Sequence, residues 1–238
     1  MSSGNYEKDE RITFNRFRKD RILSSAFALG GEKLAGASYV IRTDDGAVSD
    51  APYNSEEEID RGLEQAALIE VWARENGCWI ESPDVYYLNC GYAYYGFGGE
   101  ARVFVEGSQY VHKIVRIEQY DSPQRFSDRI VIENAICPQA CLEVEGFSND
   151  SANGFMVLLK QKFFKSIRGM EDEEIDAYMI SLGFEKIGNY KFVSKYYIAD
   201  DLHPANVLIS PDGNVNIIDG AFYFNTPDLG LGGEYTFL

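Results

Sequence analysis

Basic residues are scarce in this sequence of 238 residues, in which 22 Lys and Arg stand against 38 Asp and Glu, a net charge of −16. A surface with this excess of negative charge repels a phosphate backbone, so nucleic-acid binding would need a strong local basic patch. The best basic cluster, at residues 16–21, is short and is typical of a solvated helix face. We therefore expect no nucleic-acid partner.

Cysteine, histidine and long apolar runs are also scarce. Of the four cysteines, Cys137 and Cys141 lie four residues apart, but no second pair at ligand spacing accompanies them. This pattern is neither a disulfide scaffold nor a zinc site, and it indicates reduced, buried thiols. No apolar run reaches the length of about 18 residues that a membrane helix needs, and the N-terminus lacks the apolar core of a signal peptide. We expect a soluble, cytoplasmic protein without a membrane partner.

Apolar residues make up 45% of the chain and aromatic residues 14%, enough for a globular core. The first clear element is a helix over residues 55–77, with apolar residues at helical spacing from Ile59 to Val71 and Ser55 as its cap. The sequence before residue 53 is mixed and polar and predicts no element.

From Trp79 onward the pattern changes to strands and hairpins rich in Tyr, Val, Ile and Phe. An alternation of strands with two helices, followed by short strands, predicts an α+β fold. The expected elements are strands over 79–119 with a turn at 106–109, a helix at 124–135, an antiparallel pair at 141–147 and 154–164, a helix at 170–183, and short strands up to 219 with a turn at 211–213.

The strongest motif lies in the stretch YYIADDLHPANVLISPDGNVNIIDG. Asp201 and Asn206 are five residues apart, the spacing of the D-x-x-x-x-N catalytic loop, and Asp219 follows Asn206 by thirteen. Asp201 would orient an acceptor hydroxyl and accept its proton, whereas Asn206 and Asp219 would hold magnesium through oxygen atoms. Asn and Asp also occur simply as turn residues. Three of them at these intervals, between short apolar strands, favour a site for phosphoryl transfer.

A glycine-rich stretch, GFGGEARV, can cradle phosphates ahead of this loop. Its pattern G-x-G-x-x-A uses small residues, which let backbone N–H groups approach a nucleotide. Such a stretch is often only a turn, but its place between two strands and ahead of a strand lysine supports nucleotide binding. The residues expected to contact the nucleotide here are Gly96, Gly98, Gly99, Ala101 and Val103.

The strand lysine is Lys113, in YVHKIV, where apolar neighbours favour a functional position over an outward-facing one on an alternating strand. Lys113 would contact the nucleotide phosphates, and a carboxylate on the next helix would hold its ammonium group. Glu133 shares a helix face with Phe126 and Ile130 and is the first candidate. Asp128 is the alternative.

Four stretches, GGEARVF, DRIVIENAICP, EEIDAYMISLGFEK and DLHPANVLISPDGNVNIIDG, together resemble the kinase domain found in polyvalent proteins of phages and conjugative elements. That group is similar in turn to the protein-kinase-like superfamily, including aminoglycoside phosphotransferases with D-L-H-P-x-N loops. The resemblance spans roughly residues 60–225. It implies a kinase-like fold with ATP and Mg²⁺ between two lobes, and Lys113, Asp201, Asn206 and Asp219 in the roles given above.

The chain departs from protein kinases at two motifs. At residues 199–201 it reads Ala-Asp-Asp in place of H-R-D, so we expect His203 of D-L-H-P to brace the loop and to complete the catalytic set of Lys113 and Asp201. At residues 219–221 it reads Asp-Gly-Ala in place of D-F-G, which keeps the metal ligand and loses the aromatic residue. Only 18 residues follow Gly220, so we expect a reduced platform for a protein substrate.

These observations predict a two-lobed, protein-kinase-like α+β fold with an antiparallel sheet in the N-terminal lobe and a much reduced C-terminal lobe. The expected parts are an N-terminal extension with a helix at 1–85, the N-terminal lobe at 86–162 and the C-terminal lobe at 163–238. The expected function is an ATP- and magnesium-dependent kinase whose alcohol acceptor is a protein or a small molecule, with a basic acceptor favoured by the acidic surface. Two alternatives stay open: a non-catalytic kinase-like binding module (a pseudokinase) of a phage or mobile element, and nucleotidyl transfer by the same residues.

Overall fold

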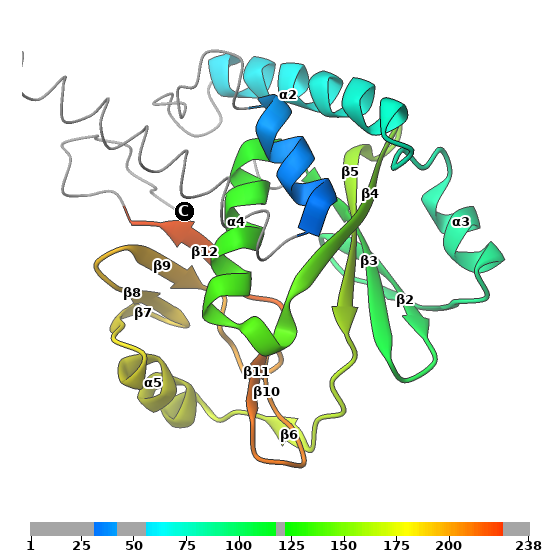
Figure 1. Cartoon of the computed structure of the whole chain (residues 1–238). Coiled ribbons are helices and arrows are strands. Elements are labelled where there is room, and N and C mark those ends of the chain that lie inside the picture. The colour runs from blue at the N-terminus through cyan, green and yellow to red at the C-terminus, as the bar shows by residue number, and fades with distance from the viewer. Residues whose placement is uncertain (1–30, 42–55, 118–121, 226–238) are drawn as a thin grey trace, which may run out of the picture.

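The structure of the chain is a computed structural model, which describes residues 31–41, 56–117 and 122–225. Helices and antiparallel sheets form a mixed α+β architecture, as the sequence predicts (Figure 1). The basic cluster at 16–21 and the expected helix cap Ser55 lie outside the described residues.

Two helices precede the first sheet. The predicted one is α2 (Glu56–Glu75), and the other, over residues 31–41, was not predicted because its surroundings are polar. Its buried residues Leu34, Ala37 and Ile41 recur at helical spacing, which is the signal that identifies it. No helix in the part of the chain that the structure describes is long and apolar enough to cross a bilayer.

The largest sheet has five antiparallel strands in the order β1-β2-β3-β5-β4. The predicted turn at 106–109 joins β2 to β3, and the predicted antiparallel pair is β4 with β5. One face packs against the helix over 31–41, α2 and α4, and the other face packs against α3 (Figure 1). The strands are β1 (Ala93–Phe97), β2 (Ala101–Glu106), β3 (Tyr110–Arg116), β4 (Leu142–Asp150) and β5 (Gly154–Lys162).

The helix α3 (Pro83–Asn89) corrects the prediction of strands throughout 79–119. Pro83 at its first position is a helix-start signal, but the Tyr- and Val-rich composition indicated strands. Tyr87 is fully buried, with its ring 5.3 Å from that of Phe104 and 5.1 Å from that of His112, so tertiary packing decides the conformation. The expected boundary at residue 85 falls within this helix, and the division into three parts stays a prediction.

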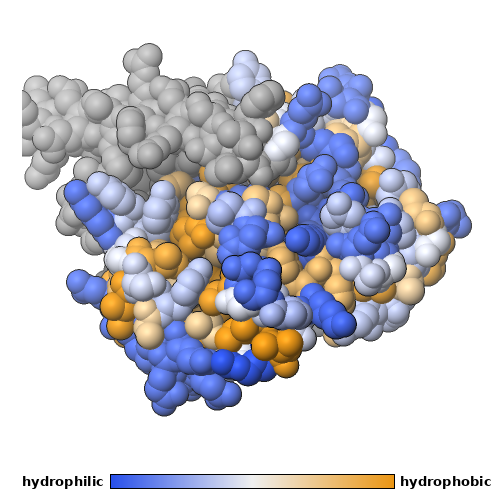
Figure 2. Space-filling view, turned by 60° about the horizontal axis from the view of Figure 1, so that its bottom comes forward, coloured by the Kyte–Doolittle hydropathy of each residue, from blue (hydrophilic) through white to orange (hydrophobic). Residues whose placement is uncertain are grey.

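The chain after β5 builds two smaller antiparallel sheets and one helix. The sheets have the strand orders β11-β10-β6 and β12-β9-β8-β7, and the predicted turn at 211–213 joins β10 to β11. Ile167, Ile180 and Ile187 are exposed here. On the face drawn in Figure 2, hydrophobic and hydrophilic residues are interspersed. The elements are β6 (Arg168–Gly169), α5 (Asp172–Ser181), β7 (Glu185–Gly188), β8 (Lys191–Val193), β9 (Tyr197–Asp200), β10 (Val207–Ile209), β11 (Val215–Ile217) and β12 (Ala221–Phe224).

The helix α4 (Pro123–Ile136) connects the two groups of elements and matches the helix predicted at 124–135. Ser122 caps it by accepting a hydrogen bond from the backbone N–H of Arg125 at 3.3 Å. Phe126 and Ile130 pack into the core beneath the five-stranded sheet, whereas Ile132 packs into the core of the smaller sheets. Because both faces are buried, α4 holds its polar side chains in fixed positions between the two groups.

The cysteines after α4 agree in part with the prediction of buried thiols. Cys137 is buried, in line with the prediction, but Cys141 is only half-buried because it lies in the short link after the 3₁₀ helix Pro138–Ala140. All four cysteines of the chain are free thiols, and burial raises the pKa of Cys137 well above its ordinary value.

Candidate active site

A pocket of about 330 Å³ lies between the five-stranded sheet, α4 and the loops that carry Asp201 and Asp219. This volume falls within the range of small-molecule sites, roughly 300–1,000 Å³. Every site residue expected from the sequence lines this pocket except Gly96, which pairs in register with Val103 on the edge strand. The fold therefore brings together residues as far apart in the sequence as Gly98 and Asp219.

Lys113 reaches the pocket from β3 through the alternation of a strand. Its neighbours His112 and Ile114 are fully buried on the opposite face, toward α3, so Lys113 and Val115 face the pocket. Val103 of β2 is the direct cross-strand partner of Lys113. The lysine side chain is only 13% exposed, which excludes the outward-facing position that the sequence left open.

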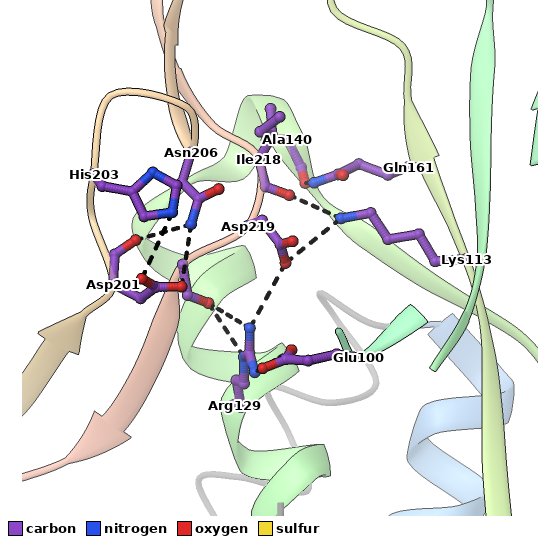
Figure 3. A network of polar contacts seen from close by, with 11 residues as sticks. Glu100, Lys113, Arg129, Ala140, Gln161, Asp201, His203, Asn206, Ile218 and Asp219 are labelled. Carbon is purple, nitrogen blue, oxygen red and sulfur yellow. Dashed lines mark hydrogen bonds and ion pairs between the residues drawn. The ribbon is translucent and has the colours of Figure 1, made fainter. Parts of the chain in front are cut away.

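The ammonium group of Lys113 contacts the turn after β11 (Figure 3). Its Nζ donates a hydrogen bond to the carbonyl oxygen of Ile218 at 2.9 Å and lies 3.7 Å from Oδ1 of Asp219. The pair expected between Lys113 and Glu133 is not formed within the described residues. The physical reason is that a carbonyl and a carboxylate are both within reach across the pocket, whereas Glu133 is buried in α4.

Glu133 is a buried carboxyl group at the wall of the pocket, 1% exposed. Burial raises its pKa to about 7, and the nearby positive charges of Arg129 and Lys113 only partly offset this effect. Its Oε1 accepts no hydrogen bond from the described part of the chain. Asp128, the alternative partner for Lys113, is also buried but does not line the pocket.

The loop from Asp201 to Asn206 is held by hydrogen bonds of its own residues. Nδ2 of Asn206 donates to the carbonyl oxygen of Asp201 at 2.9 Å and to its Oδ2 at 3.3 Å. Asp201 has φ of 60°, the left-handed conformation that a non-glycine residue adopts only at a cost of about 1–2 kcal/mol. Such strained residues cluster at functional sites. The carboxylate is 64% exposed, so a molecule from solvent can reach it.

His203 lies inside this loop and contacts its backbone. Its Nδ1 accepts a hydrogen bond from the N–H of Ala205 at 3.2 Å, which assigns the ring proton to Nε2. Nε2 lies 3.7 Å from Oδ1 of Asp201. These contacts place His203 against the backbone and the carboxylate of the loop, and its bracing role stays a prediction.

Asp219 occupies the turn between β11 and β12. The backbone N–H of Ile218 donates to the carbonyl oxygen of Asn206 at 2.9 Å, which ties this turn to the loop of Asp201. Asp219 and Asn206 thus offer a carboxylate and an amide oxygen to one pocket. No group of three or more His, Cys, Asp and Glu side chains occurs at metal-binding distance within residues 31–41, 56–117 and 122–225. A cation here would need further ligands from a substrate or water.

The glycine turn between β1 and β2 forms the rim of the pocket. The N–H of Gly98 donates to the carbonyl oxygen of Ala101 at 2.9 Å, and Arg116 donates to the carbonyl oxygen of Gly99 at 2.7 Å. A Cβ on Gly99 would meet no atom within 4 Å, and its φ is not positive. Internal packing therefore does not require glycine here, and close approach of a ligand to the backbone would explain it.

Arg129 is a pocket residue that the sequence analysis missed. It lies one helical turn before Glu133 on α4 and lines the pocket with it. Its guanidinium group lies 3.8 Å from Asp219 and 3.9 Å from Glu100 (Figure 3). The available signal was a basic residue four positions before Glu133, on the same face of the predicted helix.

The described pocket lies within the part of the chain that matches a known family. Residues 62–226 match the family described as serine/threonine/tyrosine kinase found in polyvalent proteins. This match covers well over half of the chain, from α2 to the residues after β12. No curated protein matches the sequence. The chain belongs to the serine/threonine/tyrosine kinase family of polyvalent proteins.

Proposed function

We propose that this protein is a kinase that uses magnesium and ATP to phosphorylate a hydroxyl group of its acceptor. The observation that carries the proposal is the convergence of Lys113, Asp201, Asn206 and Asp219 on one pocket. In this proposal the five-stranded sheet and α4 form the N-terminal lobe. The elements from β6 to β12 form a reduced C-terminal lobe, and the nucleotide binds between them.

The walls of the pocket suit the two parts of ATP. Its apolar side chains offer a surface for a flat base, while the glycine turn presents backbone to the phosphates. Lys113 supplies a positive charge on the floor of the pocket, where a phosphate can replace the Ile218 carbonyl as its partner. The apolar residues of the lining are Ala101, Val103, Val115, Phe126, Ile130, Leu142 and Leu159.

The donor set fits magnesium. Asp219 presents a carboxylate that is 56% exposed, and Asn206 uses Nδ2 to hold Asp201, so its side-chain oxygen is left for a cation. Magnesium is usually bound by one or two protein oxygens together with phosphates and water, which matches these two ligands. When bound, it would neutralise phosphate charge as phosphoryl transfer proceeds.

Asp201 is the residue proposed to act on the acceptor. Its exposed carboxylate would orient the acceptor hydroxyl and accept its proton as the bond to the γ-phosphorus forms and the bond from that phosphorus to the departing ADP breaks. Asn206 and His203 hold the loop of Asp201 through the hydrogen bonds described above. These contacts keep the carboxylate in one orientation, which is the main protein contribution to phosphoryl transfer.

The acceptor is proposed to be a basic protein segment with a serine, threonine or tyrosine. The family description favours a hydroxyl amino acid, and the net charge of −16 attracts basic partners. A small basic molecule would be attracted by the same charge. Phosphorylation of three acceptors is compared: a basic peptide and an acidic peptide that each contain serine, threonine or tyrosine, and a small amino alcohol. Preference for the basic peptide would indicate a protein acceptor, and preference for the amino alcohol would indicate a small molecule.

The test is calorimetric titration of ATP with and without magnesium, followed by mass spectrometry of acceptors. We expect magnesium-dependent binding and a phosphate adduct, both lost in Asp219→Ala and retained in the control Asp60→Ala, an exposed residue of α2. Unchanged activity in Asp219→Ala would refute the site. An AMP adduct would identify nucleotidyl transfer instead. Absence of nucleotide binding in the folded wild type would indicate a binding module.

A further inference from the structure

Arg129 is a buried cation for which the proposed chemistry has no role. The residue is 8% exposed, and its guanidinium group lies at the junction of α4, the glycine turn and the turn of Asp219. A buried charge is costly unless hydrogen bonds and opposite charges compensate for it. Part of this compensation is unusual, because a single backbone carbonyl accepts two hydrogen bonds from the guanidinium group.

That carbonyl belongs to Gly220, the residue directly after Asp219. Nε of Arg129 donates to the Gly220 oxygen at 3.1 Å, and its Nη2 donates to the same oxygen at 2.8 Å. Two N–H groups of the planar guanidinium thus donate to the carbonyl oxygen of one peptide group. The contact from Nη2 to Oδ1 of Asp219, at 3.8 Å, is longer. Of these two contacts with the turn, the one to the backbone is therefore the closer.

Tight packing holds the backbone of Gly220 in the position where Arg129 can reach its carbonyl oxygen. A Cβ on Gly220 would lie 2.8 Å from Phe222 and 2.9 Å from Leu202, so the backbone is pressed into the core beneath the pocket. Residue 221 is alanine, which has no large side chain to anchor the turn. The hydrogen bonds from Arg129 supply that anchor from α4.

We propose that Arg129 is a positioning residue, which fixes the Asp219–Gly220 turn against α4 so that Asp219 can hold magnesium on the nucleotide. This inference rests on the proposed function for its purpose, but the anchoring itself exists without a ligand. Arg129 also lies 3.9 Å from Glu100 of the glycine turn. Through Arg129, α4 connects the segment expected over the phosphates with the segment expected to hold the metal.

The first test measures the anchor without any nucleotide. Hydrogen exchange of the backbone amides at residues 219–222 is compared in wild type, Arg129→Ala and Arg129→Lys. We expect faster exchange in both variants. Alanine removes both hydrogen-bond donors, and lysine keeps the charge but lacks the planar guanidinium that donates two hydrogen bonds to one carbonyl oxygen. Arg74→Ala is the matched control, since Arg74 is exposed on α2 and pairs with Glu70 and Glu81. Unchanged exchange in Arg129→Ala would overturn the proposal.

The second test separates positioning from general loss of structure. We expect Arg129→Ala and Arg129→Lys to weaken magnesium-dependent ATP binding about tenfold, with metal-free binding changed much less. Guanidinium ion at low, non-denaturing concentration should restore part of the magnesium dependence in Arg129→Ala and none in Asp219→Ala. Equal weakening with and without magnesium would overturn the positioning role. If the wild type binds no magnesium–ATP, the proposed function fails, while the exchange result still decides the anchor.

Discussion

Gln65 of α2 and Gln124 of α4 hold each other through two hydrogen bonds. Nε2 of Gln65 donates to Oε1 of Gln124 at 3.3 Å, and the backbone N–H of Gln124 donates to Oε1 of Gln65 at 3.0 Å. The second bond satisfies one of the N–H groups that have no partner at the start of a helix. Because α4 carries Arg129 and Glu133, this pair ties the helix before the sheet to the candidate active site.

Replacement of Gln65 by alanine should destabilise the protein. Both side chains are buried, so Gln65→Ala leaves the N–H of Gln124 without its partner, at a cost of about 1–3 kcal/mol in the free energy of unfolding. Urea denaturation measures this cost. The control is Glu64→Ala on the exposed side of α2, for which we expect a change within about 0.5 kcal/mol. Equal effects of the two variants would show that the pair contributes nothing.

The protonation of Glu133 should make stability depend on pH. Its pKa is about 7 in the folded protein against 4.5 for an ordinary glutamate, so the folded state holds the proton more tightly. The contribution of this group is therefore complete below pH 4.5 and is lost as the pH rises through 7. At about 1.4 kcal/mol per pKa unit, the loss reaches about 3 kcal/mol.

The variant Glu133→Gln isolates this effect because glutamine cannot ionise. We expect the free energy of unfolding of Glu133→Gln, relative to that of wild type, to rise by up to about 3 kcal/mol between about pH 5 and pH 8. Urea denaturation of both proteins at each pH measures this difference. Glu143→Gln, an exposed residue of β4, serves as control and should show no such trend. A relative stability of Glu133→Gln that stays constant over this range would mean that Glu133 ionises normally despite its burial.

The sequence predicts elements and site residues where the signal is local. Helical spacing and caps identify α2, α4 and α5, and turn residues identify the hairpins. Asp201 and Asn206 share a short loop, and Asp219 follows at a fixed motif spacing. These three residues can therefore be assigned to one site from their spacing in the sequence. The helix over 31–41 and α3 are missed because their helical signals are short and lie in polar or strand-like composition.

Contacts between distant segments cannot be predicted in the same way. Lys113 bonds to the carbonyl of Ile218, 105 residues away, in place of the expected Glu133. Arg129 finds a backbone carbonyl, a partner that no side-chain pattern marks. In both cases the choice depends on which surfaces meet after folding and how deeply each charge is buried. A motif names the residues of a site but does not specify their partners.

The conformation of Asp201 allows a substitution that separates chemistry from folding. Asparagine tolerates the left-handed conformation that Asp201 adopts, so Asp201→Asn should change the free energy of unfolding by less than about 0.5 kcal/mol. Loss of the base should lower phosphoryl transfer by a factor of about 10²–10⁴, with ATP binding retained. Asp212→Asn, in the exposed turn between β10 and β11, is the control. Full activity of Asp201→Asn would exclude its proposed role.

The position of the catalytic loop should depend on Gly169. This residue pairs with Leu208 across β6 and β10, and a Cβ on it would collide with the carbonyl oxygen of Pro204. Pro204 lies between Asp201 and Asn206, so Gly169→Ala must move the loop that carries both. We expect destabilisation of about 1–3 kcal/mol, together with a larger loss in kcat than in affinity for ATP, because the glycine turn and Lys113 stay in place.

Gly188→Ala provides the comparison for this substitution. A Cβ on Gly188 would lie 3.5 Å from that of Lys191, an ordinary contact, and Gly188 does not line the pocket. We expect a change within about 1 kcal/mol and unaltered turnover. Thermal unfolding and steady-state kinetics on both variants provide the measurement. If Gly169→Ala matched Gly188→Ala in both stability and turnover, the loop would accommodate the added methyl group without loss. In that case β6 would have no part in holding Asp201 beside the pocket.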